Sequence, residues 1–286
     1  MTDLPTLRLE AEALARALPR LFVRTKASEA VHLGSAGRRR AGTGEDFWQY
    51  RRYAQEDDAS RIDWRRSARG DTLFVRETEL ETARSVHFWL DPHAGFDWTS
   101  DKSRQTKADR ARLIMMATAN LLSREGERVG VLGGQPAGFG KRALERLFTQ
   151  LSEPLGEIPQ PPRRAGSVIL ASDFYDPMDV WKERLAPLAK KARSGVLMAI
   201  SDPIERTFPF EGRVKLSRPG SVLERILGRA ETLRDTYVER LERNRSELRQ
   251  LASDLGWRLI EHETDDEAIK GAAALHALLS EVGAPS

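Results

Sequence analysis

Three aspartates stand where predicted strands end, and their side chains could do chemistry together. Three short apolar segments each end on one of these residues, Asp91, Asp173 and Asp202. In an open α/β sheet, ligands bind beyond the carboxyl ends of the strands, so the three carboxylates could form a site for a divalent cation. Aspartates at strand ends also form turns and cap helices, and that structural interpretation stays open beside the metal site.

A glycine-rich stretch, GGQPAGFGKRA at 133–143, occupies the position of a phosphate-binding loop between a predicted strand and a predicted helix. Its spacing departs from the G-x-x-x-x-G-K pattern. The first glycine of that pattern would fall on Gln135, and Arg142 stands where Ser or Thr would hold Mg²⁺. We interpret the stretch as an ordinary strand-to-helix turn.

Nucleophilic catalysis finds no support in the sequence. The five histidines form no close pair and no H-E-x-x-H motif, and no G-x-S-x-G elbow is present. Ser172 precedes Asp173, but no histidine base lies nearby in the sequence. The chain has no cysteine, which excludes disulfides and thiolate metal sites.

The densest polar stretch of the chain is RYAQEDDASRIDWRRSARG at 52–70, with five arginines, four acids and two aromatic residues. The planar guanidinium of arginine pairs with carboxylates and stacks on rings, so these residues could lock a small N-terminal module onto the edge of an α/β domain. Arg, Trp and Tyr also serve as anchors of protein interfaces, so some could instead face a partner. We expect Asp63 and Arg69 to be structural and the arginines at 38–40 to be exposed.

The composition is that of a charged globular chain. Of 286 residues, 40% are hydrophobic and 31% are charged, and the net charge is only +3 because acids are interleaved with arginines. A duplex-binding protein concentrates positive charge on one face, which this pattern does not favour. The N-terminus lacks the apolar core of a secretory signal, and the apolar run at 113–122 is shorter than the ~20 residues that cross a bilayer. We therefore expect a cytoplasmic protein without a membrane span.

The elements that must position these residues alternate between strand and helix after residue 84. This alternation predicts an α/β domain over 85–286 with a doubly wound, mostly parallel sheet. Strands are expected at 86–91, 128–133, 167–173, 196–202 and 257–263, and helices at 108–126, 140–151, 180–195, 221–254 and 265–283. Residues 1–84 are expected to form a separate small mixed module that begins with a helix at 7–20 and contains a strand at 73–81.

The segment 37–81 closely resembles the pattern of the bacterial domain-of-unknown-function family 58. In that pattern a glycine-rich loop leads to an acidic-aromatic turn, and an R-x-I-D-W-x-x-S/A-A-R core precedes a strand that ends in acidic residues. A second block, SDPIERTFP at 201–209, is similar to the D-P-x-E element of the family. The motif residues that we expect to serve interaction are Gly42, Gly44, Glu45, Asp58, Arg61, Asp63, Trp64, Arg65, Arg69 and Glu79.

The resemblance implies a central domain similar to the von Willebrand factor A fold. It also implies an adaptor or chaperone-like partner of a MoxR-type AAA ATPase, without a known reaction. A metal site of that fold would use Asp-x-Ser-x-Ser after the first strand, whereas this chain has Asp91-Pro92-His93-Ala94-Gly95. Because both hydroxyls are absent from the motif, we expect a degenerate metal site and neither a metal nor another cofactor.

Several functions follow as hypotheses. The first is a non-catalytic interaction module, not an enzyme, that couples an AAA ATPase to client proteins. The alternative is a nucleic-acid-binding protein that uses the arginine-rich loop, although we expect no nucleic-acid partner. A metal-dependent hydrolase that uses Asp91 and Asp173 ranks last, because no base or nucleophile accompanies them.

Overall fold

The structure is a computed structural model that describes residues 3–18, 41–53, 63–68, 73–79, 85–163, 165–217 and 224–281. The chain divides into two compact units. The larger unit comprises residues 1–26 and 84–286, and the smaller comprises residues 27–83.

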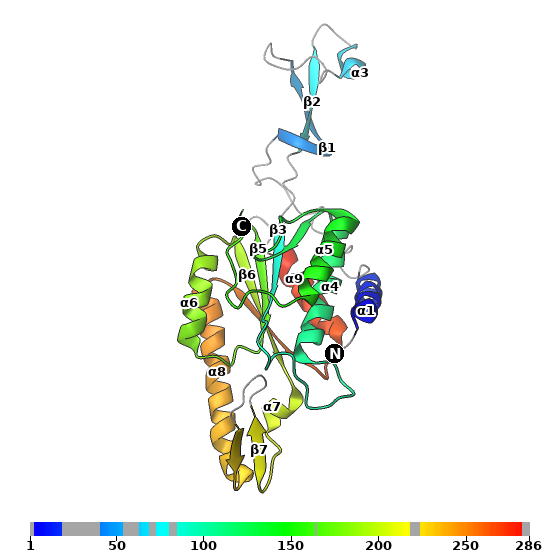
Figure 1. The fold of residues 1–286 in the computed structure, drawn as a ribbon. Helices are drawn as coiled ribbons and strands as arrows, with labels where there is room; N and C mark the ends of the chain where they lie inside the picture. The colour runs from blue at the N-terminus through cyan, green and yellow to red at the C-terminus, as the bar shows by residue number, and fades with distance from the viewer. Residues whose placement is uncertain are drawn as a thin grey trace. The chain divides into compact units, whose positions relative to one another are not determined.

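A five-stranded parallel sheet forms the centre of the larger unit (Figure 1). Its order is β4-β3-β5-β6-β9, and every neighbouring pair is parallel. The strands are β3 (Ser85–Leu90), β4 (Arg128–Val131), β5 (Ser167–Ser172), β6 (Ser194–Ser201) and β9 (Arg258–Glu263). Each was expected from the sequence to within a few residues. Strands β3 and β5 are buried on both faces and appear in the sequence as short apolar runs, whereas β9 is mixed apolar and polar.

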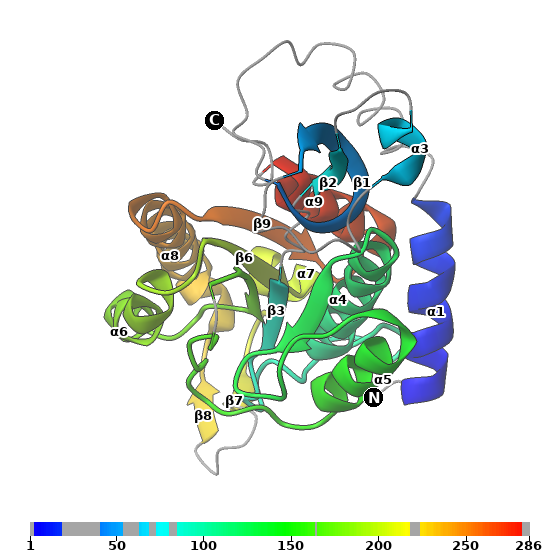
Figure 2. The ribbon, with the colours of Figure 1, turned by 90° about the horizontal axis from the view of Figure 1, so that it is seen from above.

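Helices cover both faces of the sheet, which confirms the expected doubly wound α/β class, like that of the von Willebrand factor A fold (Figure 2). One face carries α1 (Leu4–Ala17), α4 (Lys107–Arg124), α5 (Gly140–Ser152) and α9 (Ala268–Glu281), and the other carries α6 (Met178–Ala189) and α8 (Arg234–Asp254). The side chains of β3 alternate accordingly. Phe88 packs in the first core cluster and Trp89 packs in the second.

Helix α4 is buried on almost every side, because α1, α5 and α9 pack around it against the sheet. This packing explains its long apolar run, since a helix that is apolar all round belongs in a protein core or a membrane. Within the described part of the chain, no helix is both long enough and apolar enough to span a membrane.

The N-terminal helix belongs to the larger unit, whereas we expected it in a module of residues 1–84. Helix α1 packs against α4, and its buried residues Leu7, Ala11 and Ala15 join the same core cluster as the apolar side chains of α4. The two alanines let the backbones of the helices approach closely, and the amphipathic stripe is thereby buried. The boundary of the smaller unit therefore falls after residue 26.

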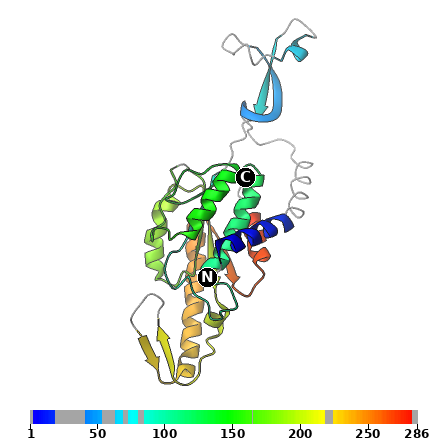
Figure 3. The same cartoon turned by 45° about the vertical axis from the view of Figure 1, so that its right-hand side comes forward.

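A long helix expected at 221–254 begins only at Arg234. The preceding residues form β8 (Glu224–Leu227), which pairs with β7 (Val214–Ser217) in an antiparallel hairpin beside the start of α8 (Figure 3). Arg229 has extended backbone angles, with φ −143° and ψ 92°, and separates the hairpin from the short 3-10 helix η2 (Ala230–Leu233). The regular spacing of leucines through this region therefore extends across a strand, a break and a helix.

The smaller unit contains a two-stranded antiparallel sheet and one helical turn. Strand β1 (Ala41–Arg52) pairs with β2 (Phe74–Glu79), and α3 (Trp64–Ser67) lies between them in the sequence. We expected a glycine-rich loop at Gly42 and Gly44, but both residues lie within β1. Gly42 and Phe47 both align with Thr78, so the glycines mark an irregularity of the strand, where glycine relieves the local distortion.

Candidate functional site

The carboxyl edge of the central sheet gathers the three aspartates, as their positions predicted. Strands β3, β5 and β6 are neighbours, and Asp91, Asp173 and Asp202 directly follow their ends. All three residues are buried. Each carboxylate is engaged by a different set of groups, however, and the set around Asp173 includes a lysine that sequence reasoning missed.

Lys107 places its ammonium among acidic and aromatic side chains. Its Nζ atom lies 2.8 Å from Asp173 Oδ2 and 2.6 Å from Glu205 Oε1, and the side chain is 1% exposed. The rings of Trp98 and Tyr175 lie 5.8 and 5.3 Å from Nζ, within the range of cation–π attraction. A fixed positive charge therefore occupies this edge of the sheet.

The start of α4 positions this lysine. Lys107 is the first residue of the helix, and Thr106 caps the helix by accepting a hydrogen bond from the Asp109 backbone N–H at 3.0 Å. The backbone N–H of Lys107 donates to the Trp98 carbonyl at 3.1 Å. The capped helix start thus directs a long cationic side chain toward the strand ends.

Burial and charge act in opposite directions on Lys107 and Glu205. Burial alone lowers the pKa of Lys107, but Asp173 and Glu205 outweigh it and leave that pKa above its ordinary value. Burial raises the pKa of Glu205, and Lys107 opposes that rise. Burial also raises the pKa of Tyr175, so its hydroxyl stays protonated and donates to Glu205 Oε2 at 3.2 Å. The cluster is a charge-assisted network rather than an isolated pair.

His93 stands where the first hydroxyl of an Asp-x-Ser-x-Ser motif would be, and both its ring nitrogens are engaged. Its Nδ1 accepts the Phe96 backbone N–H at 2.8 Å, so in the neutral ring the proton sits on Nε2 and points to Asp173 Oδ1 at 3.3 Å. The backbone N–H of His93 donates to Asp91 at 3.0 Å. This histidine therefore links the turn after β3 to the end of β5.

Ser172 is tied to Asp91 in a way that does not suit a nucleophile. Its hydroxyl donates to Asp91 Oδ2 at 2.6 Å and accepts the Phe174 backbone N–H at 3.1 Å. Burial raises the pKa of Asp91, while the Ser172 hydrogen bond opposes the rise. Phe174 has φ +54°, a left-handed backbone that is uncommon for a bulky residue and directs the chain sharply away after β5.

The second motif block, around Asp202, has a structural explanation. Asp202 caps α7 (Pro203–Thr207) in a capping box, and Glu205 accepts the Asp202 backbone N–H at 2.9 Å. Ser100 donates to Asp202 through its hydroxyl at 2.5 Å and its backbone N–H at 3.0 Å. Burial would raise the pKa of Asp202, but these hydrogen bonds leave it below its ordinary value. The block thus holds Glu205 in position to reach Lys107.

The donor set at this edge fits a divalent cation poorly. Among the described residues, no three His, Cys, Asp or Glu side chains are placed to hold a metal ion together. A cation would also compete with the Lys107 ammonium for the oxygens of Asp173 and Glu205. Mg²⁺ and Ca²⁺ need several oxygen ligands that are free to converge, which this network does not offer.

The smaller unit holds the motif residues of the arginine-rich stretch. Asp63 caps α3 by accepting the Arg66 backbone N–H at 3.0 Å, which supports the expected structural role. The Ser67 hydroxyl donates to the Asp63 carbonyl at 2.8 Å and accepts the Phe74 backbone N–H at 2.9 Å, so α3 is tied to the start of β2. On this locked turn, Trp64 is 63% exposed and Arg65 is also exposed.

For the other described motif residues, the structure gives their positions in the strands. Gly42, Gly44 and Glu45 lie in β1, and Glu79 ends β2. The motif residues Asp58, Arg61 and Arg69 lie outside the described residues. The arginines at 38–40 also lie outside them.

Comparison with known proteins gives a family match. The sequence profile of the family described as "Protein of unknown function DUF58" matches residues 49–247, well over half of the chain. Uncharacterized proteins of Mycobacterium bovis and of two strains of Mycobacterium tuberculosis are each 27% identical over 248 residues, which cover 78% of this chain and 76% of each relative. No solved structure matches the chain.

Proposed function

This chain belongs to the DUF58 family of proteins of unknown function, and we propose that it is a non-catalytic module that binds another protein through the α3 turn. The observation that carries the proposal is the exposure of Trp64 on a turn whose backbone is locked by Asp63 and Ser67. An indole held outward on a rigid turn has little conformational entropy to lose on binding, which favours an interface anchor.

The neighbourhood of Trp64 has the composition of an interface. Arg65 is exposed next to it in the sequence, and Leu73, which precedes the residue that Ser67 ties to α3, is 40% exposed. Trp and Arg are enriched at the energetic centres of protein interfaces, and an apolar neighbour helps to exclude water from such a centre. The guanidinium of Arg66 lies 5.7 Å from the ring of Phe74, so this arginine contributes to the support of the turn.

The carboxyl edge of the larger unit supports the non-catalytic part of the proposal. Ser172 is hydrogen-bonded on both its donor and acceptor sides, and His93 uses both ring nitrogens. A catalytic base needs a lone pair that can reach the proton it takes, and a nucleophile needs an oxygen that can reach the substrate. The ammonium of Lys107 occupies the carboxyl edge of the sheet, as expected for a structural network.

For the partner, we propose a MoxR-type AAA ATPase, with client proteins as further partners, as the resemblance of the motif blocks implies. The even interleaving of 46 basic and 43 acidic residues favours a protein surface over a phosphate backbone.

The test is direct binding of the full chain to a purified MoxR-type ATPase, with ATP and with ADP. We expect Trp64→Ala to weaken binding at least about tenfold, as is typical of an aromatic anchor. Leu9→Ala is the matched control, because Leu9 is an apolar side chain that is 70% exposed on α1. Equal binding by the wild type and Trp64→Ala would refute the role of the turn, and absence of any complex would refute the partner.

Nucleic-acid binding can be distinguished from protein binding by its dependence on salt concentration. Binding that depends on phosphate contacts weakens steeply as salt rises, whereas an aromatic-anchored protein interface persists. We expect no retardation of duplex or single-stranded DNA by the chain at moderate salt. Tight, salt-sensitive retardation would favour the alternative that uses the arginine-rich segment.

A further inference from the structure

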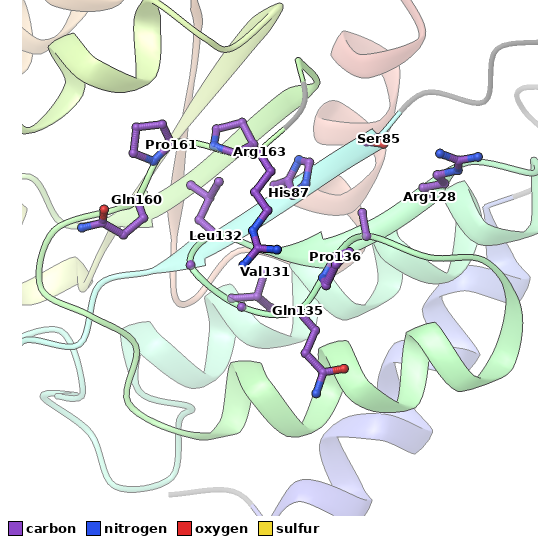
Figure 4. Close-up of a pocket in the computed structure, with 14 residues that line it drawn as sticks. Ser85, His87, Arg128, Val131, Leu132, Gln135, Pro136, Gln160, Pro161 and Arg163 are labelled. Carbon is purple, nitrogen blue, oxygen red and sulfur yellow. The ribbon is translucent and has the colours of Figure 1, made fainter.

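A pocket of about 600 Å³ opens on one face of the central sheet, at the β3–β4 end (Figure 4). It lies on the face that carries α6 and α8, but neither helix contributes to its lining. The loop 132–138 and the segment 160–163 line it instead. Two contacts hold these loops in place. Gly138 pairs with Val129 in an isolated bridge, and the Trp89 indole donates to the Gly156 carbonyl at 3.0 Å.

His87 lies in the lining of this pocket. His87 lies two residues before Trp89, so both side chains point to the same face of β3, and His87 is only 8% exposed. Its Nδ1 is buried and has no hydrogen-bond partner among the described residues. Burial lowers the pKa of His87, so the ring is neutral near pH 7. The Nδ1 atom is inaccessible to solvent, and a Cβ built on Gly166 would lie 3.3 Å from it, so His87 supplies a neutral wall of the pocket rather than a hydrogen bond to a ligand.

The charged residues that line the pocket are both arginines. Arg128 and Arg163 contribute to the lining, and no acidic side chain does. Within the described part of the chain, neither guanidinium has an ion-pair partner, and Arg128 stacks on the ring of Phe139 at 4.7 Å. Figure 4 shows the side chain of Arg163 extending across the pocket on the side where His87 lies. Two unpaired guanidiniums favour a ligand with a carboxylate or phosphate group.

The remaining walls are apolar and rigid. Leu132 directly follows β4, while Pro136, Pro161 and Pro162 come from the two loops. Proline fixes its own backbone angle, so these walls cost little entropy to order around a ligand. The volume lies within the range of small-molecule sites, which combine apolar walls with a few polar groups.

We infer that this pocket binds a small anion that carries a flat apolar portion, such as an aromatic carboxylate or an aromatic phosphate. Arg163 and Arg128 pair with the anionic group, and the prolines pack against the flat portion. The pocket shares no lining residue with the carboxyl edge or the α3 turn, so the inference does not depend on the proposed protein-binding function.

The test uses benzoate and phenyl phosphate as probes and neutral benzamide as their uncharged counterpart. Titration of the isotope-labelled full chain, followed by amide chemical shifts, locates binding. We expect one or both anions to shift the backbone amides of the pocket lining, and benzamide to bind much more weakly. Since proline has no amide proton, the reporting residues are Val131, Leu132, Gly133, Gly134, Gln135, Ala137, Gln160 and Arg163. Stronger binding of phenyl phosphate would assign a phosphate ligand, and stronger binding of benzoate would assign a carboxylate.

Variants assign the contacts. Arg163→Gln is expected to weaken anion binding about tenfold, as loss of a charge-assisted hydrogen bond does. Arg243→Gln is the matched control, because Arg243 is exposed on α8 away from the pocket lining, and it is expected to change binding less than about twofold. The inference is overturned if neither anion shifts the pocket amides below about 10 mM, if benzamide binds equally well, or if a double Arg128→Gln and Arg163→Gln variant binds unchanged. Both arginines lie at the pocket surface, so their variants test the site without removing the buried His87.

Discussion

The Nζ atom of Lys107 lies 2.8 Å from Asp173 Oδ2, and this contact joins the start of α4 to the carboxyl end of β5. An ion-dependent adhesion site of the kind implied by the family resemblance would place a divalent cation near this edge. Here the positive charge comes from within the chain and cannot dissociate. The carboxyl edge of the sheet is therefore held together by an ion pair within the larger unit.

Removal of that internal charge should be costly. In Lys107→Met, the buried carboxylate of Asp173 loses its cation and faces the carboxylate of Glu205. Breaking a buried pair by removing one partner typically costs about 3–5 kcal/mol of unfolding free energy. We expect a loss of this size in urea denaturation at pH 7. Lys102→Met is the control, because Lys102 is exposed on the preceding loop and should change stability by less than about 0.5 kcal/mol. A loss below about 1 kcal/mol in Lys107→Met would show that the network contributes little.

Divalent cations should distinguish the wild type from a variant without the ammonium. We expect Mg²⁺ and Mn²⁺ not to bind the wild type in the sub-millimolar range, because the oxygens of Asp173 and Glu205 already serve Lys107. In Lys107→Ala, the same oxygens are released, and millimolar Mg²⁺ should raise the melting temperature of the variant but not of the wild type. Calorimetry is the measurement. A clear titration of the wild type that Asp91→Ala abolishes would contradict this prediction.

Gly195 should tolerate no side chain. A Cβ placed on this residue of β6 would lie 2.1 Å from an atom of the Trp257 ring, far inside van der Waals contact. Trp257 is buried in the second core cluster and cannot simply swing out. We expect Gly195→Ala to destabilise the larger unit by about 2–3 kcal/mol through overpacking. Gly228→Ala is the matched control, since a methyl group on Gly228 would meet nothing within 4 Å. Equal melting temperatures for the two variants would contradict the packing argument.

The central sheet could be predicted from the sequence because local patterns determine it. The strand 167–172 has an apolar centre at 168–171 and is followed by Asp173, so both the strand and the sheet edge that carries Asp173 follow from chain order. The absence of hydroxyls in the segment after Asp91 could likewise be seen without a structure. What could not be seen is that His93 fills their place by accepting one backbone N–H and donating to Asp173.

Lys107 escaped prediction because nothing local marks it. It is one lysine at the start of a helix, and its partners lie 66 and 98 residues further along the chain. The position of α1 escaped for the same reason, since an amphipathic stripe shows that a helix packs but not against which element. The second strand of the hairpin before α8, β8, was mistaken for helix because leucines spaced three to four residues apart continue across it, whereas a short strand was expected where β7 lies. Side-chain spacing alone does not detect the extended backbone of Arg229.

The cap of α3 should control the order of the turn that presents Trp64. Asp63→Ala removes the acceptor of the Arg66 backbone N–H, and loss of such a cap typically costs about 1 kcal/mol. We expect faster hydrogen exchange at the Arg66 and Phe74 amides, because both report on the linked bonds of Asp63 and Ser67. Asp63→Asn keeps a capping oxygen and should exchange nearly as slowly as the wild type. Unchanged exchange in Asp63→Ala would show that other contacts hold the turn.

Acid should destabilise the larger unit through His262 of β9. Burial, assisted by the positive charge of Arg110, lowers the pKa of His262 from 6.5 to about 4. Its Nε2 has no hydrogen-bond partner among the described residues, so protonation finds no compensating acceptor. Below pH 6.5 the unfolded chain binds a proton at this residue that the folded chain refuses until about pH 4. Stability that is fully present at pH 7 is therefore lost as the pH falls through this window.

The size of the effect follows from the pKa difference. Linkage gives a loss of about 2 kcal/mol at pH 5 relative to pH 7, approaching about 3 kcal/mol near pH 4. His262→Gln removes the titrating group, so its unfolding free energy should fall less over the same range in urea denaturation. A residual decline is expected because burial also lowers the pKa of His87. If the wild type and His262→Gln lose stability in parallel between pH 7 and 5, the buried imidazole is not what makes the fold sensitive to acid.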